Sequence, residues 1–197
     1  FPEAYLSHYS ALLFHNLAEP LQWDDLYISK ERSRYPATRK ALKQCTINRA
    51  FLKDTKISNY FTYYGEHRVY LLVGTFSDNL GVVNIDNTKV TDLERTLIDI
   101  TVQPMYGGGI QQVLKAYENS RGRASIKKLK LYLEKLNYTY PYHQAVGFYL
   151  EKAGFPTEEV ALMRDIPISF DFYLSRGTGQ HNYSEKWRVF YEDLIEH

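Results

Sequence analysis

The sequence has a single cysteine, Cys45, and no long hydrophobic run. One thiol excludes an internal disulfide and any zinc site built from several cysteines. No apolar stretch approaches the roughly 20 residues of a membrane span, and no signal-peptide pattern is present, so we expect a cytoplasmic protein without membrane contact. With 44% hydrophobic and 24% charged side chains over 197 residues, the chain is too apolar for a disordered protein and long enough to build one core unaided.

The sequence also lacks the motifs of common enzymes. It has no Gly-x-Ser-x-Gly nucleophile motif, and no base is recognisable for Cys45. The triplet at 107–109, Gly-Gly-Gly, has no Walker lysine or hydroxyl and indicates a tight turn between helices, although a bare helix N-terminus can hold an anion. His8 and His15, two helical turns apart, have no carboxylate or cysteine at ligand spacing. We therefore predict no catalytic residues, no metal and no cofactor.

A nuclease is the alternative that the residues leave open. Such a site needs two or three carboxylates near a lysine to hold a divalent ion. Asp78, Asp86 and Lys89 could be placed in that pattern, but their neighbours indicate turns. The interpretation without catalysis is the simpler one.

The net charge is only +1, yet it is unevenly distributed. Residues 30–56 hold nine basic residues against two acidic ones, and residues 121–150 hold six against one. Such segments are typical of a surface that faces a polyanion, an acidic partner protein or only solvent. The candidate DNA- or partner-binding residues are Arg32, Arg34, Arg39, Lys40, Lys43, Arg121, Arg123, Lys127, Lys128 and Lys130.

The N-terminal half predicts a helix over 5–17 and then β structure. Strands are expected at 24–29, 57–64, 68–74 and 81–85, with a hairpin at Gly65-Glu66-His67 and an irregular segment or short helix at 37–50. Because residues that read as a helix begin so close to Phe1, which is not a methionine, we expect the chain to be the C-terminal part of a longer protein.

The second half predicts four helices and a late strand. Thr91-Asp92-Leu93-Glu94 is a capping box with Thr91 as N-cap, and it precedes an apolar stripe that ends before Pro104. Further helices are expected from the glycine triplet to Asn119, from an N-cap at Ser125, and over 142–153, with a strand at 166–174. In the helix after Ser125 one face is apolar, formed by Ile126, Leu129, Leu133 and Leu136, and Lys127, Lys128, Lys130 and Lys135 lie largely off that face as a basic strip. The order predicts an α+β fold: a mixed or mostly antiparallel sheet with about four helices packed on it. We expect one domain over 1–197; an alternative division has a β-rich lobe at 1–90 and a lobe at 91–197 with the helices and the late strand.

Three segments carry a resemblance to a known family. They are the opening Tyr5-Leu6-Ser7-His8-Tyr9-Ser10-Ala11-Leu12, the stretch Val90-Thr91-Asp92-Leu93-Glu94-Arg95-Thr96-Leu97-Ile98-Asp99 followed by Pro104-Met105-Tyr106-Gly107-Gly108-Gly109, and the run Tyr140-Pro141-Tyr142-His143-Gln144-Ala145-Val146-Gly147-Phe148-Tyr149-Leu150. In these segments the chain resembles AbiEi-family antitoxins of the AbiE, or type IV, toxin–antitoxin systems, which serve bacterial phage defence.

The resemblance implies a protein with two roles. An N-terminal winged helix would bind operator DNA and repress transcription of its own operon, and the C-terminal domain would counteract a nucleotidyltransferase-like toxin. This sequence has no winged helix, so the resemblance favours the antitoxic role, with the basic segments assisting operator binding in the full-length protein. A purely structural adaptor is the third hypothesis.

Overall fold

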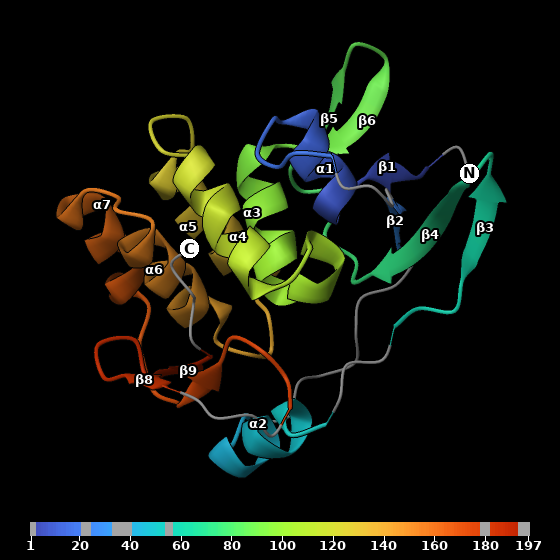
Figure 1. Cartoon of the computed structure of the whole chain (residues 1–197). Helices are drawn as coiled ribbons and strands as arrows, with labels where there is room; N and C mark the ends of the chain where they lie inside the picture. The colour runs from blue at the N-terminus through green and yellow to red at the C-terminus, as the bar shows by residue number, and fades with distance from the viewer. Residues whose placement is uncertain (1–2, 21–24, 33–40, 54–56, 178–181, 193–197) are drawn as a thin grey trace.

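The computed structural model of the chain describes residues 3–20, 25–32, 41–53, 57–177 and 182–192. These residues form a mixed six-stranded sheet, a group of helices beside it, and a small three-stranded sheet. Figure 1 shows the large sheet at the right, the helices at the centre and left, and the small sheet below the helices. The predicted α+β class, with helices packed on a mixed sheet, is confirmed.

The large sheet has the strand order β3-β4-β2-β1-β6-β5. Its strands are β1 (Tyr5–Leu6), β2 (Leu26–Glu31), β3 (Phe61–Tyr64), β4 (His67–Gly74), β5 (Val82–Ile85) and β6 (Thr88–Thr91). The short β1 lies in the middle, antiparallel to β2 and parallel to β6, so that Leu6 is opposite both Ile28 and Val90. Strands β2 and β4 run parallel, and each end of the sheet is an antiparallel hairpin.

The two hairpins use different turn residues. The predicted β3–β4 hairpin is confirmed and turns at Gly65, whose φ of 61° suits a residue without a side chain. The β5–β6 hairpin turns at Asp86 and Asn87, which have φ angles of 48° and 62°, as a type I′ turn requires. Strand β5 was expected from the sequence, whereas β6 has no counterpart among the predicted strands.

The helices follow the chain in a regular order. They are α1 (His8–Phe14), α2 (Gln44–Phe51), α3 (Leu93–Val102), α4 (Ile110–Asn119), α5 (Ile126–Leu136), α6 (Tyr142–Lys152) and α7 (Thr157–Ala161), with the 3-10 turns η1 (Pro104–Gly107) and η2 (Leu162–Asp165). Helices α3 to α6 are the four that the sequence predicts. The short helix α7 and the turn η2 were not expected.

The predicted helix over 5–17 is wrong at its start. Tyr5 and Leu6 extend into the sheet, because their backbones pair with β2 instead of turning. The helix begins only after Ser7, its N-cap, and its first residue His8 has a φ of 50°. Chain direction therefore changes sharply at a buried Ser-His pair.

The predicted cap of α3 is displaced by one residue. Thr91 is the last residue of β6, and its hydroxyl lies 2.8 Å from that of Thr96. The N-cap is Asp92, whose carboxylate accepts the backbone N–H of Arg95 at 2.9 Å. Glu94 does not reach back to the cap, because its carboxylate accepts the backbone N–H of Ser125 at 2.8 Å instead.

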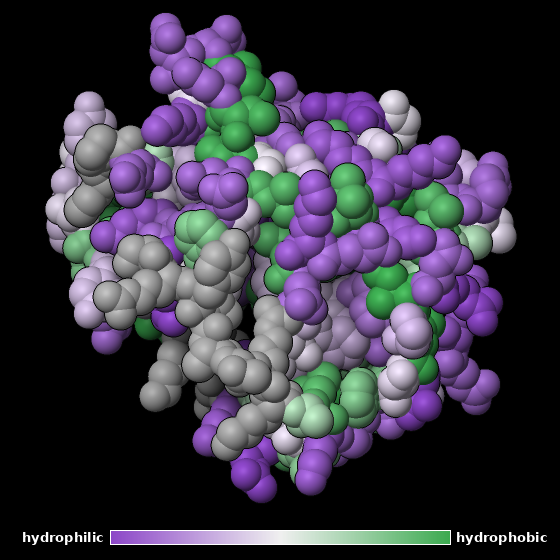
Figure 2. Space-filling model, turned by 180° about the vertical axis from the view of Figure 1, so that it is seen from behind, coloured by the Kyte–Doolittle hydropathy of each residue, from purple (hydrophilic) through white to green (hydrophobic). Residues whose placement is uncertain are grey.

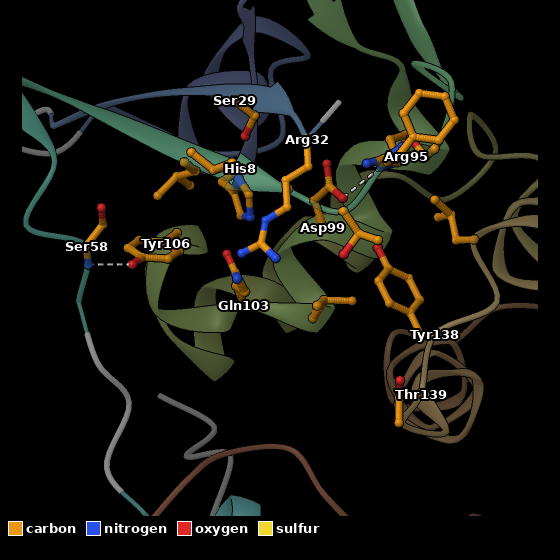
Figure 3. A pocket seen from close by; sticks show the side chains of 18 of the residues that line it. His8, Ser29, Arg32, Ser58, Arg95, Asp99, Gln103, Tyr106, Tyr138 and Thr139 are labelled. Carbon is orange, nitrogen blue, oxygen red and sulfur yellow. Dashed lines mark hydrogen bonds and ion pairs between the residues drawn. The ribbon is translucent and has the colours of Figure 1, made fainter. Parts of the chain in front are cut away.

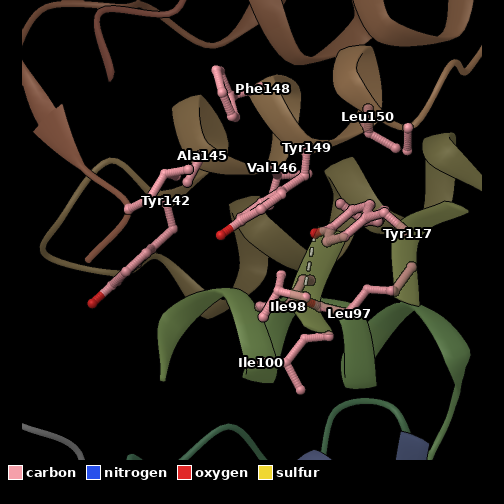
Figure 4. Close-up of a cluster of buried hydrophobic side chains, with 14 of the residues drawn as sticks. Leu97, Ile98, Ile100, Tyr117, Tyr142, Ala145, Val146, Phe148, Tyr149 and Leu150 are labelled. Carbon is pink, nitrogen blue, oxygen red and sulfur yellow. Dashed lines mark hydrogen bonds between the residues drawn. The ribbon is translucent and has the colours of Figure 1, made fainter. Parts of the chain in front are cut away.

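The main core lies between α1 and the helices α3 to α6. Figure 4 shows Leu97, Tyr117 and Tyr149 stacked between α3, α4 and α6, and all three are at most 1% exposed. The rings of Tyr117 and Tyr149 lie 5.3 Å apart and nearly parallel. The hydroxyl of Tyr117 lies 2.9 Å from that of Thr101, so this buried ring keeps a hydrogen bond.

The small sheet covers the far side of α6. Its strands β7 (Phe172–Tyr173), β9 (Val189–Tyr191) and β8 (Asn182–Ser184) lie in that order. Trp187, 1% exposed, packs against Gly147, where a Cβ would overlap its ring. Gln144 donates to the carbonyls of Phe170 and Trp187 at 2.8 and 2.7 Å.

The strand predicted over 166–174 is mostly wrong. Only Phe172 and Tyr173 enter a ladder, with β9. Ile168 and Phe170 still pack against the core. The alternation of apolar and polar residues in this segment therefore indicates that one side is buried, although no strand of the described residues pairs with it at these positions.

Helix α2 lies against this C-terminal segment. Gln44 donates to the carbonyl of Asp171 and accepts its N–H, at 2.9 and 2.8 Å. At the other end of α2, the carbonyl of Phe51 accepts the N–H of Gly177 at 2.9 Å, and the Arg176 guanidinium donates to the carbonyl of Ala50. Residues about 125 positions apart in sequence are thereby joined.

Candidate functional site

Helix α5 carries the predicted basic strip, and its phase is as the sequence predicts. Ile126, Leu129 and Leu133 are buried. Lys127 is exposed. The ammonium of Lys128, however, lies 3.1 Å from Asp92 and 2.8 Å from Glu94.

Lys130 is paired in the same way, because its ammonium lies 2.7 Å from a carboxylate oxygen of Asp165. The exposed Arg123 donates to the carbonyl of His15 at 2.8 Å, and Arg121, also exposed, donates to the carbonyl of Glu118. Among the described residues, no carboxylate pairs with Lys127, Arg121 or Arg123. The charges of Lys128 and Lys130, by contrast, are each paired with a carboxylate.

The remaining predicted basic residues divide into two groups. Arg32 and Lys43 are exposed and line one cleft. Arg34, Arg39 and Lys40 lie outside the described residues.

Residues 90–109 form the joint between the sheet and the helices. Arg95 and Asp99, one helical turn apart on α3, make an ion pair of 2.8 Å with side chains only 7% and 9% exposed. Arg95 also donates to the carbonyl of Leu80 and to the hydroxyl of Ser77, at 2.6 and 3.1 Å. Burial opposes the charge of Arg95, but the adjacent carboxylate outweighs it and raises the pKa of the guanidinium.

The glycine triplet of the same segment makes the expected turn. Gly108 and Gly109 have φ angles of 89° and 91°, and Gly109 is the N-cap of α4. A Cβ on Gly107 would lie 2.8 Å from the Cβ of Ile100, so this position lets η1 approach α3 closely. The glycine triplet and the Arg95–Asp99 pair therefore have structural roles: they hold α3, η1 and α4 in place.

A cleft of about 1250 Å³ opens beside this joint. It is bounded by the ends of β2 and β4, by α3 and η1, and by the segments on either side of α2 and after α5. Figure 3 shows Arg32 reaching into the middle of the cleft, with Asp99 and Gln103 nearby and Tyr106 on one wall. Three described lining residues are cationic, namely Arg32, Lys43 and Arg95, and Asp99 is the one described anion.

The floor of the cleft contains a buried histidine. His8 is 6% exposed, its Nδ1 lies 3.0 Å from the hydroxyl of Ser7, and that hydroxyl lies 2.7 Å from the hydroxyl of Ser29. Burial lowers the pKa of His8, so its ring is neutral near pH 7. The positive φ of His8 is a further cost that folds tend to carry at functional positions.

Tyrosines complete the walls of the cleft. The hydroxyl of Tyr106 accepts the backbone N–H of Ser58 at 2.8 Å, which ties η1 to the segment before β3. Burial raises the pKa of the hydroxyls of Tyr5 and Tyr138. A large cleft with converging polar groups and several shifted pKa values is the usual form of a ligand site.

The other sequence candidates for chemistry do not join this cleft. Cys45 is exposed on α2. His15 lies 2.6 Å from the carbonyl of Thr91. Asp78 and Asp86 have positive φ in turns, and the described residues contain no group of three or more side chains able to hold a metal ion.

An exposed aromatic segment lies at the edge of the large sheet. Among Ile57, Tyr60, Phe61, Tyr63 and Tyr64 the exposed fraction ranges from 46% to 76%. Strand β3 pairs only with β4, so its outer edge is open within the described part of the chain. On the face in Figure 2, by contrast, hydrophilic residues cover most of the surface and hydrophobic ones form small groups.

The fold and the cleft define an α+β protein with a central mixed sheet and a polar cleft at its junction with the helices. No family model and no curated protein matches the chain. A solved structure does match: the crystal structure of the Rv2827c protein from Mycobacterium tuberculosis, with a TM-score of 0.65 and 13% sequence identity. The match covers 96% of this chain and 62% of that chain, so this chain spans less than two thirds of its structural neighbour. At this identity the likeness concerns the fold alone.

No helix of the described residues has the length and apolar character to cross a membrane.

Proposed function

We propose that the chain is a regulatory antitoxin domain that counteracts a nucleotidyltransferase-like toxin and assists operator binding in the full-length protein. The observation that supports the proposal best is the placement of residues 90–109, which resemble AbiEi-family antitoxins. They form the buried joint of sheet and helices, from the Asp92 cap and the Arg95–Asp99 pair to the glycine turn. The resemblance therefore rests on residues that join the sheet to the helices and not on an isolated helix.

Because most of those residues are buried, partner contacts are expected at other, exposed residues. The exposed cations Arg121, Arg123 and Lys127 are the ones that would meet phosphates or an acidic partner. Lysine and arginine at such positions strengthen DNA binding through the backbone without reading bases. Lys128 and Lys130 contribute less, since their charges are already compensated within the domain.

The proposal is tested by co-expression of the domain with a nucleotidyltransferase-like toxin taken from the same genome. The domain should restore growth to cells that produce the toxin. Failure of the folded, full-length protein to restore growth would refute the proposal.

Charge reversal then separates the two roles. Arg121→Glu with Lys127→Glu should weaken operator binding by the full-length protein, and log K should become less steep in log salt by roughly one unit per lost phosphate contact. The matched control is Lys115→Glu, an exposed lysine of α4. Loss of growth rescue with unchanged DNA binding would assign these residues to the toxin interface, and no change in either would leave them as a solvated face.

A further inference from the structure

The cleft brings together three features that favour an anion. Arg32 and Lys43 come from different walls, one at the end of β2 and the other before α2, and both are exposed. Within the described part of the chain neither has a carboxylate within ion-pair distance. The third feature is the start of α2, whose first turn has neither a side-chain cap nor an acidic residue. The N–H groups of Thr46 and Ile47 donate to the carbonyl of Lys43. Since Lys43 and Thr46 line the cleft, what the start of α2 offers there is the positive end of the helix dipole, which favours negative charge.

The position of Arg32 is fixed by the sheet. Its backbone N–H donates to the carbonyl of Gly74 at 3.2 Å, which continues the β2–β4 pairing by one residue. The side chain thus projects from a held backbone, and Figure 3 shows its guanidinium in the open middle of the cleft. A planar guanidinium in such a place suits the oxygens of a phosphate group.

The floor offers a different chemistry. Asp99 uses one carboxylate oxygen for Arg95 at 2.8 Å, and the neutral His8, Gln103 and the hydroxyl of Tyr138 lie around it as lining groups. This carboxylate repels a second anion, so phosphates belong at the rim and not at the floor. A ligand ring that is neutral and carries hydrogen-bonding groups fits the floor better than a phosphate does.

Aromatic walls add a surface for a flat ring. Tyr60, 76% exposed, and Tyr106 line the same side of the cleft, where the Ser58–Tyr106 hydrogen bond holds the segment before β3. Stacking of a nucleic-acid base on a tyrosine contributes roughly 1–3 kcal/mol. The cleft volume of about 1250 Å³ exceeds what a ligand of a few hundred Å³ needs.

We propose that this cleft binds a nucleoside phosphate, with the phosphates held by Arg32 and Lys43 beside the start of α2, and the base placed among Tyr60, Tyr106 and the polar floor. The proposal concerns a site separate from the exposed cations Arg121, Arg123 and Lys127. It does not depend on the antitoxin role.

The test is isothermal titration calorimetry of the full chain with ATP and GTP, with adenosine and guanosine, and with tripolyphosphate. At least one nucleotide should bind with heat that saturates, more tightly than tripolyphosphate or either nucleoside. Arg32→Ala and Lys43→Ala should each weaken that nucleotide by about tenfold or more, as expected for one lost hydrogen bond to a charged group. Tyr60→Ala should weaken it by roughly fivefold or more, and should leave tripolyphosphate unaffected.

Each variant has a matched control outside the lining of the cleft. Arg164→Ala and Lys115→Ala remove exposed cations elsewhere, and Tyr63→Ala removes a 67% exposed tyrosine of β3. All six positions are on the surface or at the open rim, so melting temperatures should stay close to that of the parent chain. The proposal is overturned if neither nucleotide binds below about 1 mM, if tripolyphosphate binds as tightly as both, or if the controls weaken binding as much as the cleft variants.

Discussion

Breaking the buried Arg95–Asp99 pair should be among the most damaging changes to this fold. Both side chains are less than a tenth exposed, and Arg95 also holds the Leu80 carbonyl and the Ser77 hydroxyl. Removing one partner of a buried pair costs about 3–5 kcal/mol, since the other charge stays buried and uncompensated. Arg95→Met should fall in that range, because it leaves both the Asp99 carboxylate and the Leu80 carbonyl without their donor.

Asp99→Asn should cost less than Arg95→Met, about 3 kcal/mol. Arg95 then keeps its two other acceptors and can still donate to the amide oxygen. The double variant Arg95→Met with Asp99→Asn should recover part of the loss, because no buried charge remains.

The measurement is urea denaturation of all four proteins, followed by far-ultraviolet circular dichroism at fixed pH. The double-mutant cycle gives the coupling between the two residues. A cost below about 1 kcal/mol for both single variants, or a double variant as unstable as the sum of the singles, would refute the reasoning and mean that water reaches this joint.

Three further changes test other parts of the structure. Gly147→Ala should lower stability by about 1–2 kcal/mol in thermal denaturation, because overlap with the Trp187 ring outweighs the gain in helix propensity; an unchanged midpoint would mean that the ring yields. Asp92→Ala should cost about 2 kcal/mol in urea, one part for the helix cap and one for the hydrogen bond from Tyr132 at 2.8 Å, and a loss below half of that would contradict the cap. The lowered pKa of His8 means that the unfolded chain binds its proton first, so stability is full above about pH 6.5 and falls below it by up to about 1.4 kcal/mol per pH unit. His8→Asn, which tolerates the positive φ, should flatten that fall, and an unchanged slope would remove His8 as its source.

The sequence predicted the helical block well because its signals are local. Helix α5 begins at the Ser125 cap and buries Ile126, Leu129 and Leu133 as their spacing indicates. Capping and periodicity need only a few neighbouring residues. The same reasoning placed the α3 cap one residue early, because Thr91 is already held in the β6 ladder opposite Val82.

The cleft was beyond such reasoning. Its groups Arg32, Lys43, Asp99 and Tyr138 come from different elements, separated by up to about a hundred residues. Several tertiary contacts bring them together, among them the pairing of β1 with β2 and β6, the packing of α5 on α3 and the bonds of α2 to Asp171. The basic composition of residues 30–56 indicated an anion-facing surface but not its shape. The ion pairs of Lys128 with Asp92 and Glu94 could not be predicted for the same reason. The phase of a helix shows which way a side chain points, but not which residues of other elements it meets there.

The clasp between α2 and residues 171–177 has a consequence for how the protein is made. During synthesis, Gln44 leaves the ribosome more than a hundred residues before Asp171, to which it bonds at both ends of its amide. The central strand β1 likewise waits for Val90 before its parallel neighbour exists. Contacts of such long sequence separation form slowly, because the chain between them must first be closed into a loop. The helices α3 to α6 can therefore gather while the chain is still growing, whereas α2 reaches its final place only after translation of the C-terminal segment is complete.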